Sequence, residues 1–153
     1  MSSVTRTVRT TPDRVWEVLA DGWLYPLWVV GAARIRDVDE AWPEVGSRIH
    51  HSVGIWPALI NDDTEVLEQE PNQLIRLRAS AWPLGQAHVE ISLTANGSRT
   101  DVVIEEHATS GPGVVLPDAA VAPLLNWRNV ETLRRLAFIA EKRPIQQRAG
   151  QSR

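Results

Sequence analysis

The sequence of 153 residues contains no cysteine, and only one tyrosine, one phenylalanine and one methionine. Without cysteine there is no disulfide framework, no thiol nucleophile and no thiolate metal site. Basic residues are not in excess, because 16 Lys and Arg stand against 19 Asp and Glu and give a formal net charge of -3. A nucleic-acid binder needs clustered Lys and Arg to contact phosphates, so we expect no nucleic-acid partner.

Long apolar runs are also missing. No window approaches the ~18 apolar residues of a membrane span, and the N-terminal residues lack the apolar core of a signal peptide. We therefore expect a cytoplasmic protein with no integral membrane association. Motifs for phosphate loops, dinucleotide binding, zinc proteases and nucleophile elbows do not occur either, and Gly111-Pro112-Gly113 lacks the lysine of a phosphate loop. We expect no cofactor.

What the sequence does contain is seven tryptophans and enough apolar residues for one core. Hydrophobic residues make up 43% of the chain and charged residues 23%, which is typical of a globular domain rather than a disordered one. We expect a single domain over residues 1–143, followed by a flexible tail over 144–153.

The periodicity predicts a meander of strands between two helical regions. Thr11 and Pro12 are suited to the start of a helix, and Pro26 and Gly31 limit a second, shorter one. Between residues 34 and 108 the apolar residues recur with a period of two. The expected strands are 4–10, 34–39, 47–54, 58–68, 74–80, 87–94 and 100–108, and the expected helices are 12–19, 23–30 and 119–142, with a loop at 109–118.

This order of elements, together with several short motifs, resembles the SRPBCC or START-like helix-grip superfamily. That superfamily includes START lipid-transfer domains, plant pathogenesis-related allergens and polyketide cyclase/dehydrase-like proteins. The motifs are TPDRVWEVL at 11–19, YPLW at 25–28, VGSR at 45–48, EPNQL at 70–74 and GSRT at 97–100. The resemblance implies an α+β fold in which a curved seven-stranded antiparallel sheet wraps around a long C-terminal helix. It further implies two short helices after the first strand, and an apolar cavity between the sheet and the long helix.

Strand alternation sorts the polar residues between cavity and solvent. Glu106 shares a face with Ile104, and His51 shares a face with Ile49, so both polar side chains are expected to point inward together with Val89 and Ile91. A carboxylate facing an apolar cavity must be paired, hydrogen-bonded or protonated. Glu106 is therefore a general acid/base, a ligand anchor, or one half of a structural salt bridge to Arg6 or another basic residue.

The same sorting gives little support to a metal site. His50 and His51 are neighbours in a strand and cannot both reach one ion. Only His51 and Glu106 remain for a site inside the cavity. The solvent face carries His88, Glu90, Glu105 and His107, for which cross-strand charge pairing is the alternative. We expect no metal.

The long helix carries two asparagines on its apolar face. At ~100° per residue, the face centred on Leu133 includes Ala122, Asn126 and Asn129. Buried amides need hydrogen-bond partners, so Asn126 and Asn129 bond to the sheet, to ordered water or to a ligand. Arg128 falls on the outer side, where we expect a solvated or edge contact.

Three tryptophans precede proline, at Trp42, Trp56 and Trp82, which favours stiff, extended turns. Alternate connections of a meander lie at the same end, so Trp56, Trp82 and the loop 109–118 share one end and Trp42 lies at the other. The resemblance implies that the shared end is the cavity mouth. Trp56 and Trp82 are then either lids over an apolar ligand or caps of the core or of a dimer contact.

The main functional prediction is binding of a small hydrophobic or aromatic molecule in the cavity. One alternative is an enzyme of the polyketide cyclase/dehydratase type in which Glu106 or His51 moves protons. A further alternative is a protein-interaction module of the co-chaperone kind, and a homodimer is also left open. The predicted ligand-binding residues are Trp56, Trp82, Ile49, Val89, Ile91, Ile104, Ala122, Leu125, Asn126, Asn129 and Leu133. Trp16 and Trp28 are expected in the core.

Overall fold

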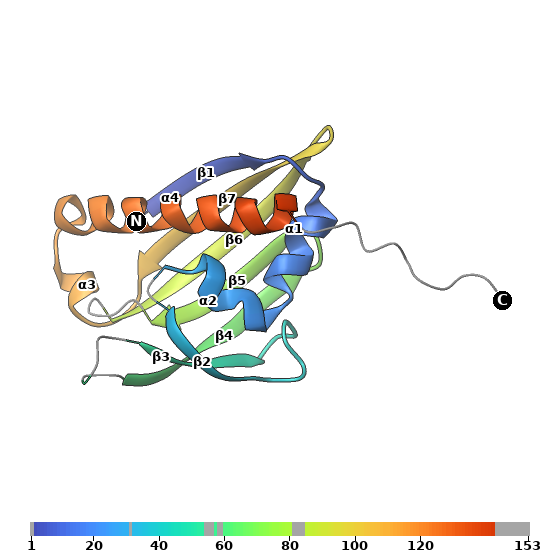
Figure 1. Ribbon diagram of the computed structural model, residues 1–153. Helices are drawn as coiled ribbons and strands as arrows, with labels where there is room; N and C mark the ends of the chain where they lie inside the picture. The colour runs from blue at the N-terminus through green and yellow to red at the C-terminus, as the bar shows by residue number, and fades with distance from the viewer. Residues whose placement is uncertain (1, 31, 54–56, 58–59, 81–84, 143–153) are drawn as a thin grey trace.

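The computed structural model of the chain describes residues 2–30, 32–53, 57, 60–80 and 85–142 (Figure 1). The elements, in chain order, are β1 (Ser2–Val8), α1 (Pro12–Leu19), the 3-10 turn η1 (Gly22–Leu24), α2 (Tyr25–Trp28), β2 (Ala32–Val38), β3 (Arg48–Val53), β4 (Ile60–Glu70), β5 (Leu74–Ser80), β6 (Gln86–Asn96), β7 (Arg99–Ala108), α3 (Pro112–Val115) and α4 (Asp118–Lys142).

The seven strands form one antiparallel sheet in the order β1-β7-β6-β5-β4-β3-β2. Strands β2 to β7 pair with their sequence neighbours, and β1 pairs with β7, so that Val4 lies opposite Ile104. Helix α4 lies across one face of this sheet, with α1 and α2 on the same side (Figure 1). The expected α+β helix-grip fold, with its long terminal helix and short helices after the first strand, is confirmed.

The core lies between the sheet and α4. Ile49, Ile91, Ile104 and Leu133 are each exposed by 3% or less, as the strand alternation and the helix face predict. Three tryptophans belong to this core, since Trp16, Trp28 and Trp42 are all buried. The expected core positions of Trp16 and Trp28 are therefore confirmed.

The structure corrects the expected loop over residues 109–118. The short helix α3 forms at Pro112–Val115, because Pro112 presets the backbone for a first helical position and Gly111 turns the chain with a φ of 82°. The first strand also lies two residues earlier than predicted, at Ser2–Val8.

The buried face of α4 turns around the helix along its length. In the C-terminal half it contains Leu133, Leu136 and Ala137, but in the N-terminal half it is made by Val121, Leu125, Asn129 and Thr132. A single straight stripe centred on Leu133 is therefore wrong for the first turns. As a consequence Asn126 is exposed and Ala122 is half-buried.

The outer face of the sheet carries a ladder of opposite charges. Arg48 pairs with Glu65 at 3.0 Å, Arg78 also contacts Glu65, and Arg76 pairs with Glu90 at 2.6 Å. Such cross-strand pairs hold neighbouring strands together where one face of the sheet meets water. Among the helices in the described ranges, none has the length and apolar character needed to cross a membrane.

Candidate functional site

A chain of three hydrogen-bonded side chains lies buried between the sheet and α2. The Tyr25 hydroxyl is 3.2 Å from Thr64 Oγ1, and His51 Nε2 is 2.9 Å from the same oxygen. Tyr25, His51 and Thr64 are exposed by 5%, 3% and 0%. The sequence prediction placed His51 inside, and the structure confirms that position.

Aromatic packing fixes the rings of this group. The ring of Tyr25 stacks on that of His51 with centroids 6.0 Å apart, and meets the ring of Trp28 edge-on at 5.2 Å. Tyr25 and Trp28 sit at the two ends of the four-residue helix α2, and His51 projects from β3. We refer to Tyr25, Trp28, His51 and Thr64 as the aromatic cluster.

Two atoms of the aromatic cluster are buried without a partner. Trp28 Nε1 and His51 Nδ1 make no hydrogen bond to any described residue. Buried polar atoms in native proteins are almost always paired, because an unmade hydrogen bond costs about 1–3 kcal/mol. Trp28 Nε1 is a donor only, and His51 Nδ1 donates or accepts according to the tautomer.

A second buried group surrounds Glu106, which is exposed by 1%. Its carboxylate accepts hydrogen bonds from the Arg128 guanidinium and, at 3.0 Å, from Asn129 Nδ2. Asn129 Nδ2 also donates to Ser2 Oγ at 3.2 Å, and Ser2 Oγ donates to Asn126 Oδ1 at 2.6 Å. We refer to Ser2, Glu106, Arg128 and Asn129 as the carboxylate cluster.

The carboxylate cluster decides between the expected partners of Glu106 and corrects the expected position of Arg128. Arg6 is exposed, and the partner of Glu106 is Arg128, which the sequence placed on the outer side of the long helix. The reason is the turn of the buried face of α4, which brings position 128 close to the sheet. The side chain of Glu106 points inward as predicted, and it forms an ion pair with Arg128.

The two clusters are electrostatically coupled through Tyr25. Burial raises the pKa of Tyr25 above its ordinary 10.0, while the Thr64 hydrogen bond and the charge of Arg128 lower it and the charge of Glu106 raises it. The charges of the carboxylate cluster therefore act on the buried phenol of the aromatic cluster.

Most of the predicted ligand-binding residues lie in the protein interior. Ile49, Ile91, Ile104, Leu125, Asn129 and Leu133 are buried, and Val89 packs half-buried against the core. Trp56 and Trp82 lie outside the described residues, so their place at a cavity mouth stays a prediction. Sequence reasoning missed Tyr25 and Thr64 altogether. The signal was present in Tyr25, which is the only tyrosine in the chain.

Two histidines of the outer sheet face, His88 and His107, contact each other edge-on. His88 and His107 lie opposite one another in the register of β6 and β7, with ring centroids 5.5 Å apart. Their neighbour Glu90 accepts two hydrogen bonds from Arg76, from Nη2 at 2.6 Å and from Nε at 3.0 Å. Across the part of the chain that is described, no group of three or more His, Asp or Glu side chains is arranged to hold a metal ion.

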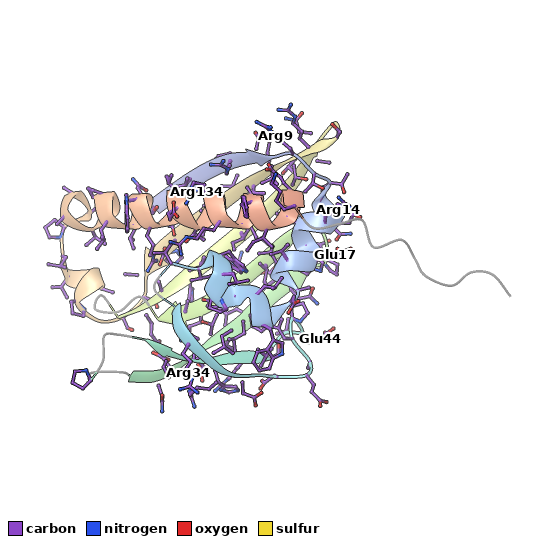
Figure 2. All side chains as sticks on the ribbon, in the orientation of Figure 1. Arg9, Arg14, Glu17, Arg34, Glu44 and Arg134 are labelled. Carbon is purple, nitrogen blue, oxygen red and sulfur yellow. The ribbon has the colours of Figure 1, made fainter. Side chains whose placement is uncertain are left out.

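A groove of about 670 Å³ is lined by no residue of either cluster; one of its lining residues is Glu17 of α1, which Figure 2 labels. None of the predicted ligand-binding residues lines it. Its lining residues are Glu17, Ala20, Asp21, Gly22, Trp23, Asp37, Val38, Asp39, Glu40 and Trp42. The groove is therefore separate from the predicted cavity.

His51 makes stability depend on pH. Burial lowers the pKa of His51 below its ordinary 6.5, and the charges of Asp62 and Asp63 offset this only in part. Below pH 6.5 the unfolded chain then binds a proton at this site that the folded chain does not, so stability falls until the lowered pKa is passed. His88, whose pKa is lowered by burial and by His107, acts in the same direction.

We therefore expect urea unfolding of His51→Gln to show a smaller loss of stability between pH 7 and pH 5 than the wild type. His88→Gln removes the outer-face imidazole whose pKa is also lowered, so it should reduce the loss in the same direction. An undiminished loss in His51→Gln would show that His51 is protonated in the folded protein as readily as in the unfolded chain.

With the geometry established, the chain can be compared with known proteins. A search of curated proteins found no match. Among solved structures, protein CV1439 from Chromobacterium violaceum is 19% identical with a TM-score of 0.64, over 92% of this chain and 97% of that one. The aromatase/cyclase ZhuI from Streptomyces sp. R1128 is 21% identical with a TM-score of 0.64, over 92% and 93%.

The di-domain ARO/CYC protein StfQ from the steffimycin biosynthetic pathway is 14% identical with a TM-score of 0.69, over 91% of this chain and 49% of its own length. At these identities the likeness shows the fold alone. The family described as polyketide cyclase / dehydrase and lipid transport matches residues 2–141, which is nearly the whole chain. The chain therefore belongs to the family of polyketide cyclase / dehydrase and lipid transport proteins.

Proposed function

We propose that the chain binds a small aromatic molecule carrying a hydroxyl group, and that the aromatic cluster holds this group. The observation that carries the proposal is the pair of buried atoms without partners, Trp28 Nε1 and His51 Nδ1. Both belong to side chains exposed by 3%. A bound ligand that satisfies them recovers the cost of their desolvation, and the rings beside them offer it an apolar surface.

The hydrogen-bond chain favours a hydroxyl over other ligand groups. If Thr64 donates to His51 Nε2, then His51 Nδ1 carries the proton and needs an acceptor. If His51 Nε2 donates to Thr64 instead, Nδ1 is a bare acceptor and needs a donor. A hydroxyl serves either arrangement, and its oxygen can also accept from Trp28 Nε1.

The test uses two probes that differ only in the hydroxyl, 2-naphthol and naphthalene. We expect the wild type to bind 2-naphthol about 10-fold more tightly, as one buried hydrogen bond of about 1.4 kcal/mol gives. Trp28→Phe removes the indole N–H and keeps a ring in place, so the preference should shrink while naphthalene affinity changes little. Isothermal titration calorimetry measures both affinities.

Trp16→Phe is the matched control, since Trp16 is also a buried tryptophan but lies on α1, outside the aromatic cluster. Equal affinity for the two probes in the wild type would contradict the proposal. Native mass spectrometry of freshly purified protein adds an independent check, because a co-purified mass identifies the natural ligand directly.

A second candidate function is proton transfer in a cyclase or dehydratase reaction, and His51 favours it. Its lowered pKa keeps the imidazole neutral near pH 7, with one ring nitrogen held by Thr64 and the other without a partner. A neutral imidazole of this kind can accept a proton from a bound substrate. Glu106 is less suited, since Arg128 and Asn129 engage both carboxylate oxygens.

Binding and catalysis are separated by His51→Asn. Catalysis predicts that this variant still binds aromatic ligands and loses turnover of a polyketide-type substrate by about 100-fold or more. If wild-type protein shows no turnover that His51→Asn abolishes, the chain is a binding protein only.

A further inference from the structure

One part of the surface consists of large apolar side chains that are exposed and do not belong to the core. Val114 and Val115 of α3, Leu116 beyond it, and Leu124, Trp127 and Val130 of α4 form what we call the α3–α4 patch. Their exposed fractions are 57%, 84%, 44%, 53%, 64% and 50%. In Figure 1, α3 and the beginning of α4 are at the same end of the molecule. Six of the ten exposed large hydrophobic residues of the described chain are gathered here.

The α3–α4 patch is also depleted of charge. From Thr109 to Trp127 the only charged residue is Asp118, although most of these residues are exposed. A solvent-facing helix normally carries charged residues opposite its buried face. Helix α4 instead presents one apolar face to the sheet and a second to the outside in its N-terminal half.

We propose that the α3–α4 patch is the interface of a homodimer with two-fold symmetry. Six large apolar side chains exposed by 44–84% offer an area on the order of several hundred Å². That is comparable with the largest patch of an isolated monomer and with the ~800 Å² that each partner contributes to a stable interface. The neighbouring exposed alanines and prolines at 117, 119, 120 and 123 extend the same uncharged surface.

Symmetry fits the shape of the patch. When two α4 helices cross about a two-fold axis, the apolar stripe on one helix packs against the same stripe on the other. One surface patch then serves both copies. Trp127, a large ring with 64% of its surface exposed, lies within this stripe. Tryptophan is the residue type most often found at the energetic centre of an interface.

The charges disfavour an anionic membrane as the occupant. Near the patch, Arg128 is bound to Glu106, and Arg134 and Arg135 both pair with Glu131 (Figure 2 labels Arg134 on α4). With Arg128 neutralised by Glu106 and two arginines sharing Glu131, one net positive charge remains, which is far fewer than the roughly four to eight Lys or Arg that attract acidic lipids. A second copy brings no such requirement, since its own patch is equally uncharged.

The test is sedimentation velocity of the full chain from about 1 to 200 µM. We expect the wild type to approach twice the chain mass of 17.1 kDa as concentration rises. Trp127→Glu should weaken the dimer by about 100-fold or more, because the substitution places a charge in the interface twice. Val115→Glu, at the most exposed position of the patch, should act in the same direction.

Trp23→Glu is the matched control, because Trp23 is 58% exposed and lies on η1, outside the patch. This variant should dimerise as the wild type does, and circular dichroism checks that all variants are folded. A wild type that stays monomeric at 200 µM would overturn the proposal. So would a dimer that Trp127→Glu and Val115→Glu leave intact. Binding of the monomer to phosphatidylcholine vesicles, lost in Trp127→Glu, would assign the patch to a membrane instead.

Discussion

Replacement of Arg128 by methionine is expected to lower the free energy of unfolding by about 3 kcal/mol or more. Glu106 is exposed by 1%, and among the described residues its carboxylate is bound to one cation, Arg128, and to the amide of Asn129. Methionine retains much of the volume of the side chain but leaves a buried carboxylate without a counter-charge. Urea unfolding at pH 7 measures the loss.

The double variant separates charge from packing. If the uncompensated charge of Glu106 causes the loss, then adding Glu106→Gln to Arg128→Met should recover part of the stability. As a control, Arg134→Met removes an arginine of the same helix that is 62% exposed and paired only with Glu131, and should cost less than about 1 kcal/mol. Equal losses in Arg128→Met and Arg134→Met would refute the structural role of the buried pair.

Gly85→Ala is the second substitution with a large expected effect, a loss of about 3 kcal/mol. Gly85 has a φ of 105°, and an added Cβ would stand 2.0 Å from the carbonyl oxygen of Ser110 and 2.8 Å from Gly111 Cα. Both atoms belong to the backbone, so the end of β7 must move away from the start of β6. The Thr109 and Ser110 hydrogen bonds to the Gln86 carbonyl, at 2.8 and 3.4 Å, would be strained.

Gly97 offers a control that isolates the backbone conformation. It too has a positive φ, of 61°, but an added Cβ meets no atom within 4 Å. Gly97→Ala should therefore cost only about 1 kcal/mol, the conformational penalty alone. Thermal unfolding of both variants checks the difference. If Gly85→Ala lowers the unfolding temperature no more than Gly97→Ala does, the backbone at Ser110 and Gly111 must move aside at little cost.

The fold was predictable because it follows from two repeats of apolar residues, with a period of about 2 in strands and about 3.6 in helices. A period of two runs through all the strands of the meander, and Pro12 and Gly22 bracket the first helix in the expected way. The inward positions of His51 and Glu106 follow from the same alternation. Only local details failed, such as α3, where a short turn of helix is set by Gly111 and Pro112 rather than by any repeating pattern.

The site was less predictable because it depends on contacts between distant elements. Strand alternation placed His51 inside but could not indicate that Thr64 and Tyr25 would meet it, 13 and 26 positions away in the sequence. The angular rule for the long helix assumed one straight buried stripe. The observed turn of that face exposes Asn126 and brings Arg128 to Glu106, a tertiary effect that helix periodicity does not contain.

The contacts between β1 and α4 have a consequence for the order in which the protein folds. Ser2 of β1 bonds to Asn126 and Asn129 of α4, and the backbone N–H of Arg9 bonds to Glu141. These contacts span 124 to 132 positions, and contacts of such long range form slowly. During synthesis, Glu106 has no counter-charge until α4 has left the ribosome. The buried region around Glu106 should therefore be completed late, and the growing chain should depend most on chaperones before α4 emerges.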